Sequence, residues 1–306
     1  MIVVAGESLI DLVPQGTGAL APLLPRLGGG PYNTAVALGR LGARTTFCSR
    51  VSTDGFGEAL VDGLRAAGVD TSLLQRGPEP TTLAVATLGA DGSAGYGFYA
   101  EGSADRLFEL PAAPLPSGVR ALALGTCSLV LEPGASAYEA LLRREAGRGL
   151  FTLLDPNVRA GLIPDPDAYR ARFESWLPYV SLLKLSEDDA AWLGGSVEEW
   201  LAAGPAAVVL TRGAEGLTVR TRGGAALDVP AVRGEVADTI GAGDTVNAAL
   251  LHRLSAHGAL SAGAPAALSA LATAAWADIL AFAARAAAIT CSRPGADPPY
   301  ATELAP

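Results

Sequence analysis

Short apolar runs alternate with amphipathic segments along most of the chain. The apolar runs predict buried strands, and segments with apolar residues at helical spacing predict helices at 34–42, 56–68 and 138–147. Alternation of this kind is typical of a parallel sheet that is covered by helices on both faces. The predicted strands are 2–5, 45–51, 121–125, 151–155, 181–185 and 207–211.

Two stretches depart from this alternation and predict hairpins. Residues 81–107 hold two strand-like runs around Asp91-Gly92, a dipeptide that favours a tight turn. A hairpin has no place between the strands of a parallel sheet, so we expect it to project from the sheet. With the strand-like run 8–14 it forms either a small β-sheet lid or a plain surface excursion. Residues 216–230 predict a second hairpin, which turns at a Gly-Gly pair.

Composition and charge exclude several classes of function. The chain has 306 residues, of which 50% are apolar, and this is enough for one large α/β domain. The net charge of −9 opposes a general attraction to nucleic acid or to an anionic membrane. Any phosphate that the protein binds must therefore be held locally, by backbone amides, a few basic side chains or a metal.

The cysteines and the apolar segments predict a cytoplasmic protein. The three cysteines show neither zinc spacing nor a disulfide framework, as expected in a reducing compartment. The first residues show no basic leader, so we expect no signal peptide. The alanine-rich stretch 262–289 is interrupted by Asp278 and Arg285, and therefore predicts buried helices rather than a membrane span.

The stretch DTIGAGDTVNAAL, residues 238–250, places Asp244 directly after two glycines at the predicted start of a helix. A P-loop needs a lysine here, and Val246 occupies the last glycine position of a dinucleotide fingerprint. An acid in a first helical turn is favoured by roughly 0.3–1 kcal/mol, which is one interpretation. In the other, the glycines let free amides approach a phosphoryl group, and the acid removes a proton from an attacking hydroxyl. The second interpretation explains better than the first why an acid lies beside an anion-binding site.

These residues resemble the C-terminal signature of the ribokinase-like (PfkB) sugar kinases, D-x-x-G-A-G-D-x-F-x-A-G. A second stretch, GGGPYNTAVALGRLGA at 28–43, resembles the other signature of that family, with Asn33 in the matching position. The likeness extends from Val3 to about Pro299. Val246 and Ala249 depart from the aromatic and glycine of the signature, and both are packing positions.

The resemblance implies one ribokinase-like kinase domain over residues 1–306. We therefore expect an α/β three-layer sandwich with a mostly parallel central sheet and helices on both faces. A small β-sheet lid is expected from about 8–26 and 80–107. The lids of this family often pair with those of a partner, so the resemblance admits a homodimer through the lid.

The resemblance also implies roles for individual residues. Asp244 is the expected catalytic base, and the amides of Gly241, Ala242 and Gly243 are expected to stabilise charge on the γ-phosphate of ATP. The expected sugar contacts are Asp11, Gly29, Gly30, Asn33, Phe98, Asn157 and Arg159. The expected nucleotide contacts are Lys184, Ser186, Thr211, Gly213, Gly216, Asn247 and Ala287.

Some of these residues have a simpler structural interpretation. Asp11 fits a polar turn residue, and Asn33 fits the cap of the following helix. Asp189 is the expected contact to Mg²⁺, through water, although the acids at 187–189 also fit a plain helix N-terminus. Some family members bind a monovalent cation near the stretch that begins at Asp238, so the resemblance admits K⁺ here.

The expected activity is that of an ATP-dependent sugar kinase with fructose as the acceptor. YGFYAEGSAD, residues 96–105, resembles bacterial fructokinases. The main alternative is a 2-keto-3-deoxygluconate kinase, whose acidic sugar Glu101 would repel if it faces inward. Ribose or nucleoside kinases are further alternatives. An inactive sugar- or nucleotide-binding regulator belongs to a different class, and a nicotinamide-dependent dehydrogenase lacks its fingerprint here.

Overall fold

Nine strands form the main sheet of the computed structural model, which describes residues 1–16, 18, 20–88, 94–260 and 264–304. They are β1 (Ile2–Ala5), β4 (Thr45–Ser52), β5 (Asp70–Gly77), β8 (Ala121–Gly125), β9 (Phe151–Asp155), β10 (Leu182–Ser186), β11 (Ala207–Thr211), β12 (Leu217–Thr221) and β13 (Ala226–Val229). Their order is β13-β12-β11-β10-β9-β8-β1-β4-β5, and all pairs from β11 to β5 are parallel. The predicted strands are thus confirmed, as is the hairpin of β12 and β13.

The central strands are apolar on both faces, because a separate hydrophobic core covers each face. Along β1, Ile2 and Val4 enter one core while Val3 and Ala5 enter the other. Successive side chains of a strand point to opposite faces, so a strand between two cores needs a continuous apolar run. This is why these strands could be predicted from short runs.

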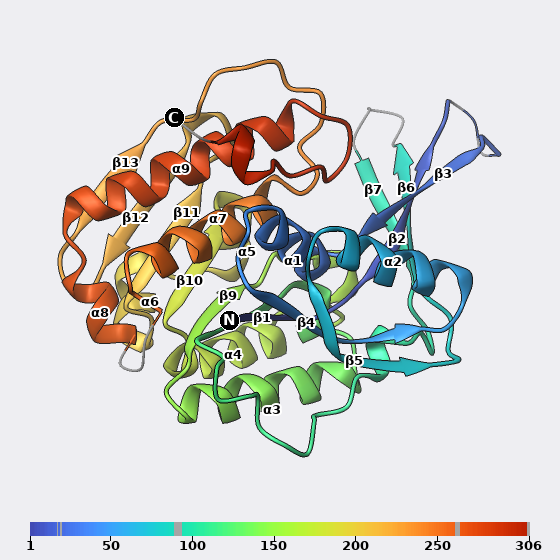
Figure 1. The fold of residues 1–306 in the computed structure, drawn as a ribbon, viewed down its shortest axis with the longest axis horizontal. Coiled ribbons are helices and arrows are strands. Elements are labelled where there is room, and N and C mark those ends of the chain that lie inside the picture. Colours follow the sequence, from blue (N-terminus) through green and yellow to red (C-terminus); the bar gives the residue numbers. More distant parts are fainter. Residues whose placement is uncertain (17, 19, 89–93, 261–263, 305–306) are drawn as a thin grey trace.

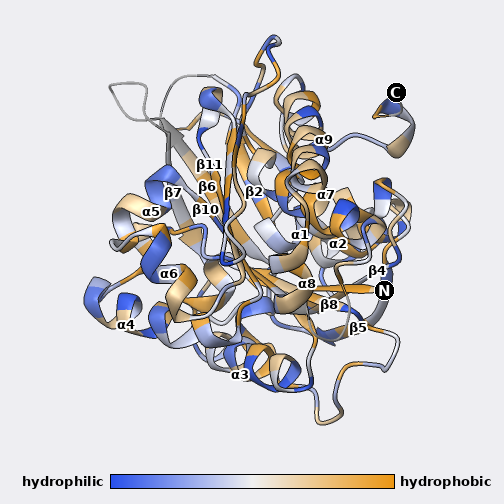
Figure 2. Ribbon diagram, turned by 90° about the vertical axis from the view of Figure 1, so that its left-hand side faces the viewer, coloured by the Kyte–Doolittle hydropathy of each residue, from blue (hydrophilic) through white to orange (hydrophobic). Residues whose placement is uncertain are grey.

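Helices form the two outer layers of a three-layer sandwich. In Figure 2, α4, α5 and α6 lie on one side of β10 and β11, and α1, α2, α7 and α9 lie on the other. The helices on the first side are α3 (Gly134–Gly147), α4 (Pro166–Trp176), α5 (Glu187–Leu193) and α6 (Val197–Ala203). Those on the second side are α1 (Gly30–Arg40), α2 (Gly55–Ala66), α7 (Ala242–Ala256), α8 (Ala264–Ala270) and α9 (Thr273–Cys291).

A second sheet of four strands projects from one end of the main sheet (Figure 1). Its order is β3-β2-β6-β7, with bounds Leu23–Gly28, Leu9–Pro14, Thr82–Leu88 and Ala94–Tyr99. β6 and β7 are antiparallel, and β2 pairs in parallel with β6. The small separate sheet is therefore confirmed. The predicted turn at Asp91-Gly92 lies outside the described residues.

The helix α9 is long and apolar enough to cross a membrane by length and composition alone. In this fold it packs along α7 and against β13, and its side chains Trp276, Ile279 and Leu280 are fully buried in the core. A core helix passes the same compositional test as a membrane span. The packing agrees with the expectation of a buried helix.

Candidate active site

The start of α7 is a turn that only glycine adopts easily. Gly241 caps the helix with φ of 77°, and a Cβ there would lie 2.6 Å from the Cβ of Ala296. The N–H of Ala242 donates to the carbonyl of Thr239 at 3.3 Å, so this amide, expected to be free, already has a protein partner. Within the described part of the chain, the N–H groups of Gly241 and Gly243 have no protein acceptor. Two of the three predicted amides are thus available at a helix N-terminus, which favours an anion.

Asp244 lies in the first turn of α7 and is 7% exposed. Its Oδ2 accepts a hydrogen bond of 2.9 Å from Nδ2 of Asn33. Asn33 itself lies inside α1, which begins at Gly30, so it is not the cap of that helix. Burial raises the pKa of Asp244 to about 7, against the hydrogen bond from Asn33, which lowers it. A carboxylate with a pKa near neutrality suits a general base.

A cavity of about 250 Å³ opens beside this carboxylate, below the small sheet. Strands and helices far apart in the sequence contribute to its wall. All the sugar contacts expected from the sequence line this one cavity: Asp11, Gly29, Gly30, Asn33, Phe98, Asn157 and Arg159. Gly241, Gly243 and Asp244 line it as well.

The wall of this cavity combines acids, a base and strained backbone. Burial raises the pKa of Asp11 to about 6, with the positive charge of Arg159 opposing it. Nη1 of Arg159 donates to Oδ1 of Asn157 at 2.7 Å. Thr126 and Asn157 follow the ends of β8 and β9 and have positive φ values of 63° and 38°. Strain of this kind is concentrated at binding and catalytic sites.

Glu7 is a wall residue that the sequence prediction missed. It follows β1, and its buried carboxylate accepts hydrogen bonds from the amides of Gly30 at 3.3 Å and Ser128 at 3.0 Å, and from the Thr126 hydroxyl. Burial raises the pKa of Glu7, and hydrogen bonds from Ser128 and Thr126 oppose this rise. Its position after the carboxyl end of a parallel strand was the available signal. Tyr96, Cys127 and Thr239 also line the cavity without having been predicted.

A second cavity, of about 680 Å³, lies on the other side of the start of α7. Its walls are mainly apolar, from β12, α7, α9 and the segment 231–236. Four of the expected nucleotide contacts line it: Thr211, Gly213, Gly216 and Ala287. The two cavities share Thr239 and Gly243, so a ligand in each would meet at the first turn of α7.

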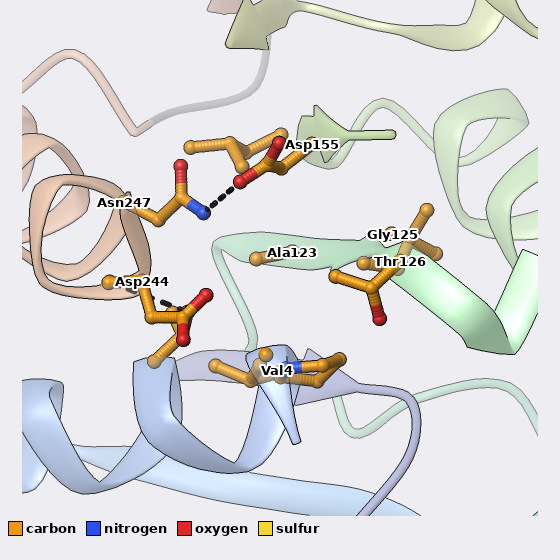
Figure 3. Close-up of a pocket in the computed structure, with 12 residues that line it drawn as sticks. Val4, Ala123, Gly125, Thr126, Asp155, Asp244 and Asn247 are labelled. Carbon is orange, nitrogen blue, oxygen red and sulfur yellow. Dashed lines mark hydrogen bonds between the residues drawn. The ribbon is translucent and has the colours of Figure 1, made fainter. Parts of the chain in front are cut away.

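The other expected nucleotide contacts lie elsewhere. Lys184 lines the smaller cavity and is buried against Asp155. Asn247 points from α7 to Asp155, as Figure 3 shows. It is not among the residues that line the larger cavity. Ser186 is the N-cap of α5 and accepts from the amide of Asp189. The structure therefore does not bring Asn247 and Ser186 to the larger cavity.

Asp189 does not fit the expected magnesium contact. Its Oδ1 accepts a hydrogen bond from the amide of Val158 at 2.7 Å. Its Oδ2 accepts hydrogen bonds from the amide and from the hydroxyl of Ser186. The side chain is buried in a capping box, which agrees with the simpler interpretation of an acidic helix N-terminus. Among the residues that the structure describes, no group of three or more His, Cys, Asp or Glu residues is placed to hold a metal ion.

Glu101 does not face the cavity. Its carboxylate is exposed and pairs with Nη1 of Arg106 at 2.7 Å. The condition under which it would repel an acidic sugar is therefore not met, and Glu101 does not discriminate against such a sugar.

Two cavities that meet at an anion-binding helix start, beside a buried carboxylate, are suited to moving a phosphoryl group between two small molecules. The fold and the site thus define a small-molecule kinase with a doubly covered α/β sheet. Residues 1–303 match the pfkB family of carbohydrate kinases. The chain belongs to this family.

Relatives by sequence are fructokinases. The chain is 39% identical to fructokinase of Rhizobium leguminosarum bv. trifolii over 262 residues, covering 83% of this chain and 79% of that protein. It is 33% identical to fructokinase of Klebsiella pneumoniae over 267 residues, covering 83% and 84%.

Solved structures show the same similarity. Fructokinase with bound ATP from Xylella fastidiosa matches with a TM-score of 0.90 at 27% identity, over 99% of this chain and 96% of that one. A fructokinase double mutant from Vibrio cholerae O395, solved with fructose, ADP and potassium, matches with a TM-score of 0.79 at 27% identity, over 96% and 93%. The protein is a carbohydrate kinase.

Proposed function

We propose that this kinase transfers the γ-phosphoryl group of ATP to a hydroxyl of fructose. The observation that supports it most is the buried carboxylate of Asp244 at the junction of the two cavities, beside the free amides of Gly241 and Gly243. Fructose enters as the acceptor because the sequence relatives are named fructokinases. ATP enters as the donor because a solved relative holds it.

In the proposed reaction, fructose binds in the 250 Å³ cavity and the triphosphate reaches across the start of α7 from the 680 Å³ cavity. Asp244 accepts the proton of the attacking hydroxyl while that oxygen forms a bond to the γ-phosphorus. The bond between the γ-phosphorus and the bridging oxygen breaks, and ADP leaves with its electron pair. The free amides and the ammonium group of Lys184 stabilise the charge on the moving group.

A divalent cation bound with ATP would neutralise part of the charge on its phosphates. Mg²⁺ usually keeps several waters and binds chiefly to substrate phosphates, so the buried Asp189 is not needed as its direct ligand. A monovalent cation such as potassium is part of the proposal only through the solved relative that holds one. We assign no residue of this chain to either ion.

The proposal includes a cytoplasmic location. All three cysteines are free thiols, which a reducing compartment maintains.

The proposal also includes a homodimer through the lid. The small sheet exposes apolar side chains on its edge strands, with Tyr99 69% and Leu23 42% exposed. These side chains would be buried in a homodimer through the lid, and light scattering of a Leu23→Glu variant tests this assembly. A monomeric wild type would end that part of the proposal.

A coupled assay of ADP release tests the activity against fructose, 2-keto-3-deoxygluconate, ribose and adenosine. We expect release only with a sugar, with the highest kcat/KM for fructose. The Asp244→Asn variant should bind both substrates and lose transfer by about 10²–10⁴-fold. A preference for 2-keto-3-deoxygluconate would correct the acceptor. Ligand binding without turnover by the wild type would favour the regulator instead.

A further inference from the structure

We propose that Asp155 is a positioning residue of the transfer reaction, which holds the ammonium group of Lys184 against the start of α7 and fixes the first turns of that helix. This inference depends on the function proposed above, because it gives a part in the same reaction to a residue that lines neither of the two substrate cavities.

One carboxylate oxygen joins three elements of the fold. Asp155 is the last residue of β9, and its Oδ2 accepts from Nζ of Lys184 at 2.9 Å and from Nδ2 of Asn247 at 2.7 Å. Lys184 belongs to the neighbouring strand β10, and Asn247 belongs to α7. The contact therefore ties the sheet to the helix that presents Asp244, as Figure 3 shows for Asn247.

Asp155 keeps Lys184 charged. Both side chains are 4% exposed. Burial alone would lower the pKa of Lys184, but the carboxylate of Asp155, together with those of Asp189 and Asp244, raises that pKa on balance. A buried lysine without such a partner tends to lose its proton. A Cβ on Gly243 would lie 3.0 Å from Nζ, so the charge lies directly beside the helix start where the two cavities meet.

Asp155 also acts on the base itself. A cavity of only about 10 Å³ lies between Asp155, Asn247 and Asp244, and Val4 and Ala123 are among the apolar residues that line it. Water screens little across so small and apolar a space, so the two carboxylates interact strongly. Asp155 raises the pKa of Asp244 by more than Lys184 lowers it.

Other titratable groups of the described residues also act on Asp244 and Lys184. Arg159, after β9, lowers the pKa of Asp244. Asp189, at the start of α5, helps to raise the pKa of Lys184. The Tyr169 side chain on α4 lies near Asp155 and Asp189, and burial raises the pKa of its hydroxyl above its usual range, so it stays neutral.

A structural role alone does not require the charge. A neutral acceptor at position 155 would hold the amide of Asn247 equally well, and a buried ion pair often contributes little net stability. The charges of Asp155 and Lys184 are explained if the transfer reaction needs the ammonium group of Lys184 and the basicity of Asp244. This is the part of the inference that an isosteric change can test.

The test is the pH profile of kcat and kcat/KM for Asp155→Asn, measured with whichever sugar the wild type phosphorylates. Because loss of the carboxylate lowers the pKa of Asp244, we expect the acid limb to move down by about one pH unit. We expect the plateau of kcat to fall about 100-fold, as when one charge-stabilising donor is lost. The matched control is Asp105→Asn. Asp105 is another buried carboxylate, which accepts hydrogen bonds from the hydroxyls of Thr82 and Ser103, and its replacement should leave the acid limb in place.

If Asp155→Asn does not fold, the double variant Asp155→Asn/Lys184→Met removes both buried charges and keeps the test possible. The acid limb should still move down, because the larger of the two effects on Asp244 is lost. An unmoved limb in either variant, or a plateau of Asp155→Asn within threefold of the wild type, overturns the inference. A wild type without sugar-dependent ADP release overturns the proposed function instead, so the two failures are distinguishable.

Discussion

Replacing Asp244 with asparagine should stabilise the protein while it removes the activity. Burial raises the pKa of this carboxyl from 3.8 to about 7 in the folded chain. Unfolding between these two pH values therefore releases a proton. The native state loses stability through this group as the pH rises from about 4 to 7, and above 7 the full penalty applies. An amide at the same place does not ionise and avoids the penalty.

The size of the effect follows from the two pKa values. The penalty from Asp244 is about 2 kcal/mol at pH 5 and about 4 kcal/mol at pH 8, at roughly 1.4 kcal/mol for each pKa unit. The packing cost of the new amide group is the same at both pH values. The gain in the free energy of unfolding should therefore grow by about 2–3 kcal/mol between pH 5 and pH 8, which corresponds to roughly 3–5 °C in Tm for a chain of 306 residues.

Urea unfolding of wild type and Asp244→Asn at the two pH values measures this difference directly. Asp228→Asn is the control, because this exposed acid pairs with Arg220 and hydrogen bonds lower its pKa. Its replacement should give no gain that grows with pH. A stability difference for Asp244→Asn that stays constant from pH 5 to pH 8 would refute the assignment of a near-neutral pKa to the folded carboxyl.

Three further substitutions test other parts of the site. Asn33→Ala removes the 2.9 Å hydrogen bond to Asp244, so the acid limb of kcat/KM should move up by about one pH unit, opposite to Asp155→Asn; an unmoved limb would exclude this contact as a determinant of the base. In Glu7→Gln, the side-chain NH2 group would face the amides of Gly30 and Ser128, which donate to the carboxylate in the wild type. Because two donors cannot pair, KM for the sugar should rise about tenfold while KM for ATP stays the same, and equal changes in both KM values would contradict this. Phe98→Ala opens the lid side of the cavity, so the ratio of ADP released to sugar phosphorylated should rise above one; a ratio that stays at one would limit Phe98 to packing.

The parts of the fold that could be predicted are those whose signal lies within a few residues. β1 and β9 are buried on both faces, so each is a continuous apolar run. The strand β5, with the sequence DTSLLQRG, was not predicted. It lies at the edge of the sheet, and most of its residues are polar and at least partly exposed. Polar edge strands lack the apolar run on which the prediction depends.

The parts of the site that could be predicted are those that a local motif positions. Gly241 and Asp244 lie in one turn, and the turn alone sets their relation to the helix start. Asn247 lies one turn later, and its partner Asp155 is 92 positions away in the sequence. Which residue Asn247 contacts depends on how α7 is rotated against β9, and the packing of the whole core sets that rotation. A motif therefore could not place this side chain.

The basicity of the catalytic carboxylate is likewise a property of the assembled fold. Burial raises the pKa of Asp244, Asn33 from α1 lowers it, Asp155 from β9 raises it, and Lys184 from β10 lowers it. These opposed contributions give a value of about 7, at which a buried base can both lose and accept a proton near neutral pH. A change in any one of the contributing segments would move the optimum while leaving the signature around Asp244 unchanged. The motif thus identifies the base, whereas the pH range in which it works depends on three other segments that the motif does not contain.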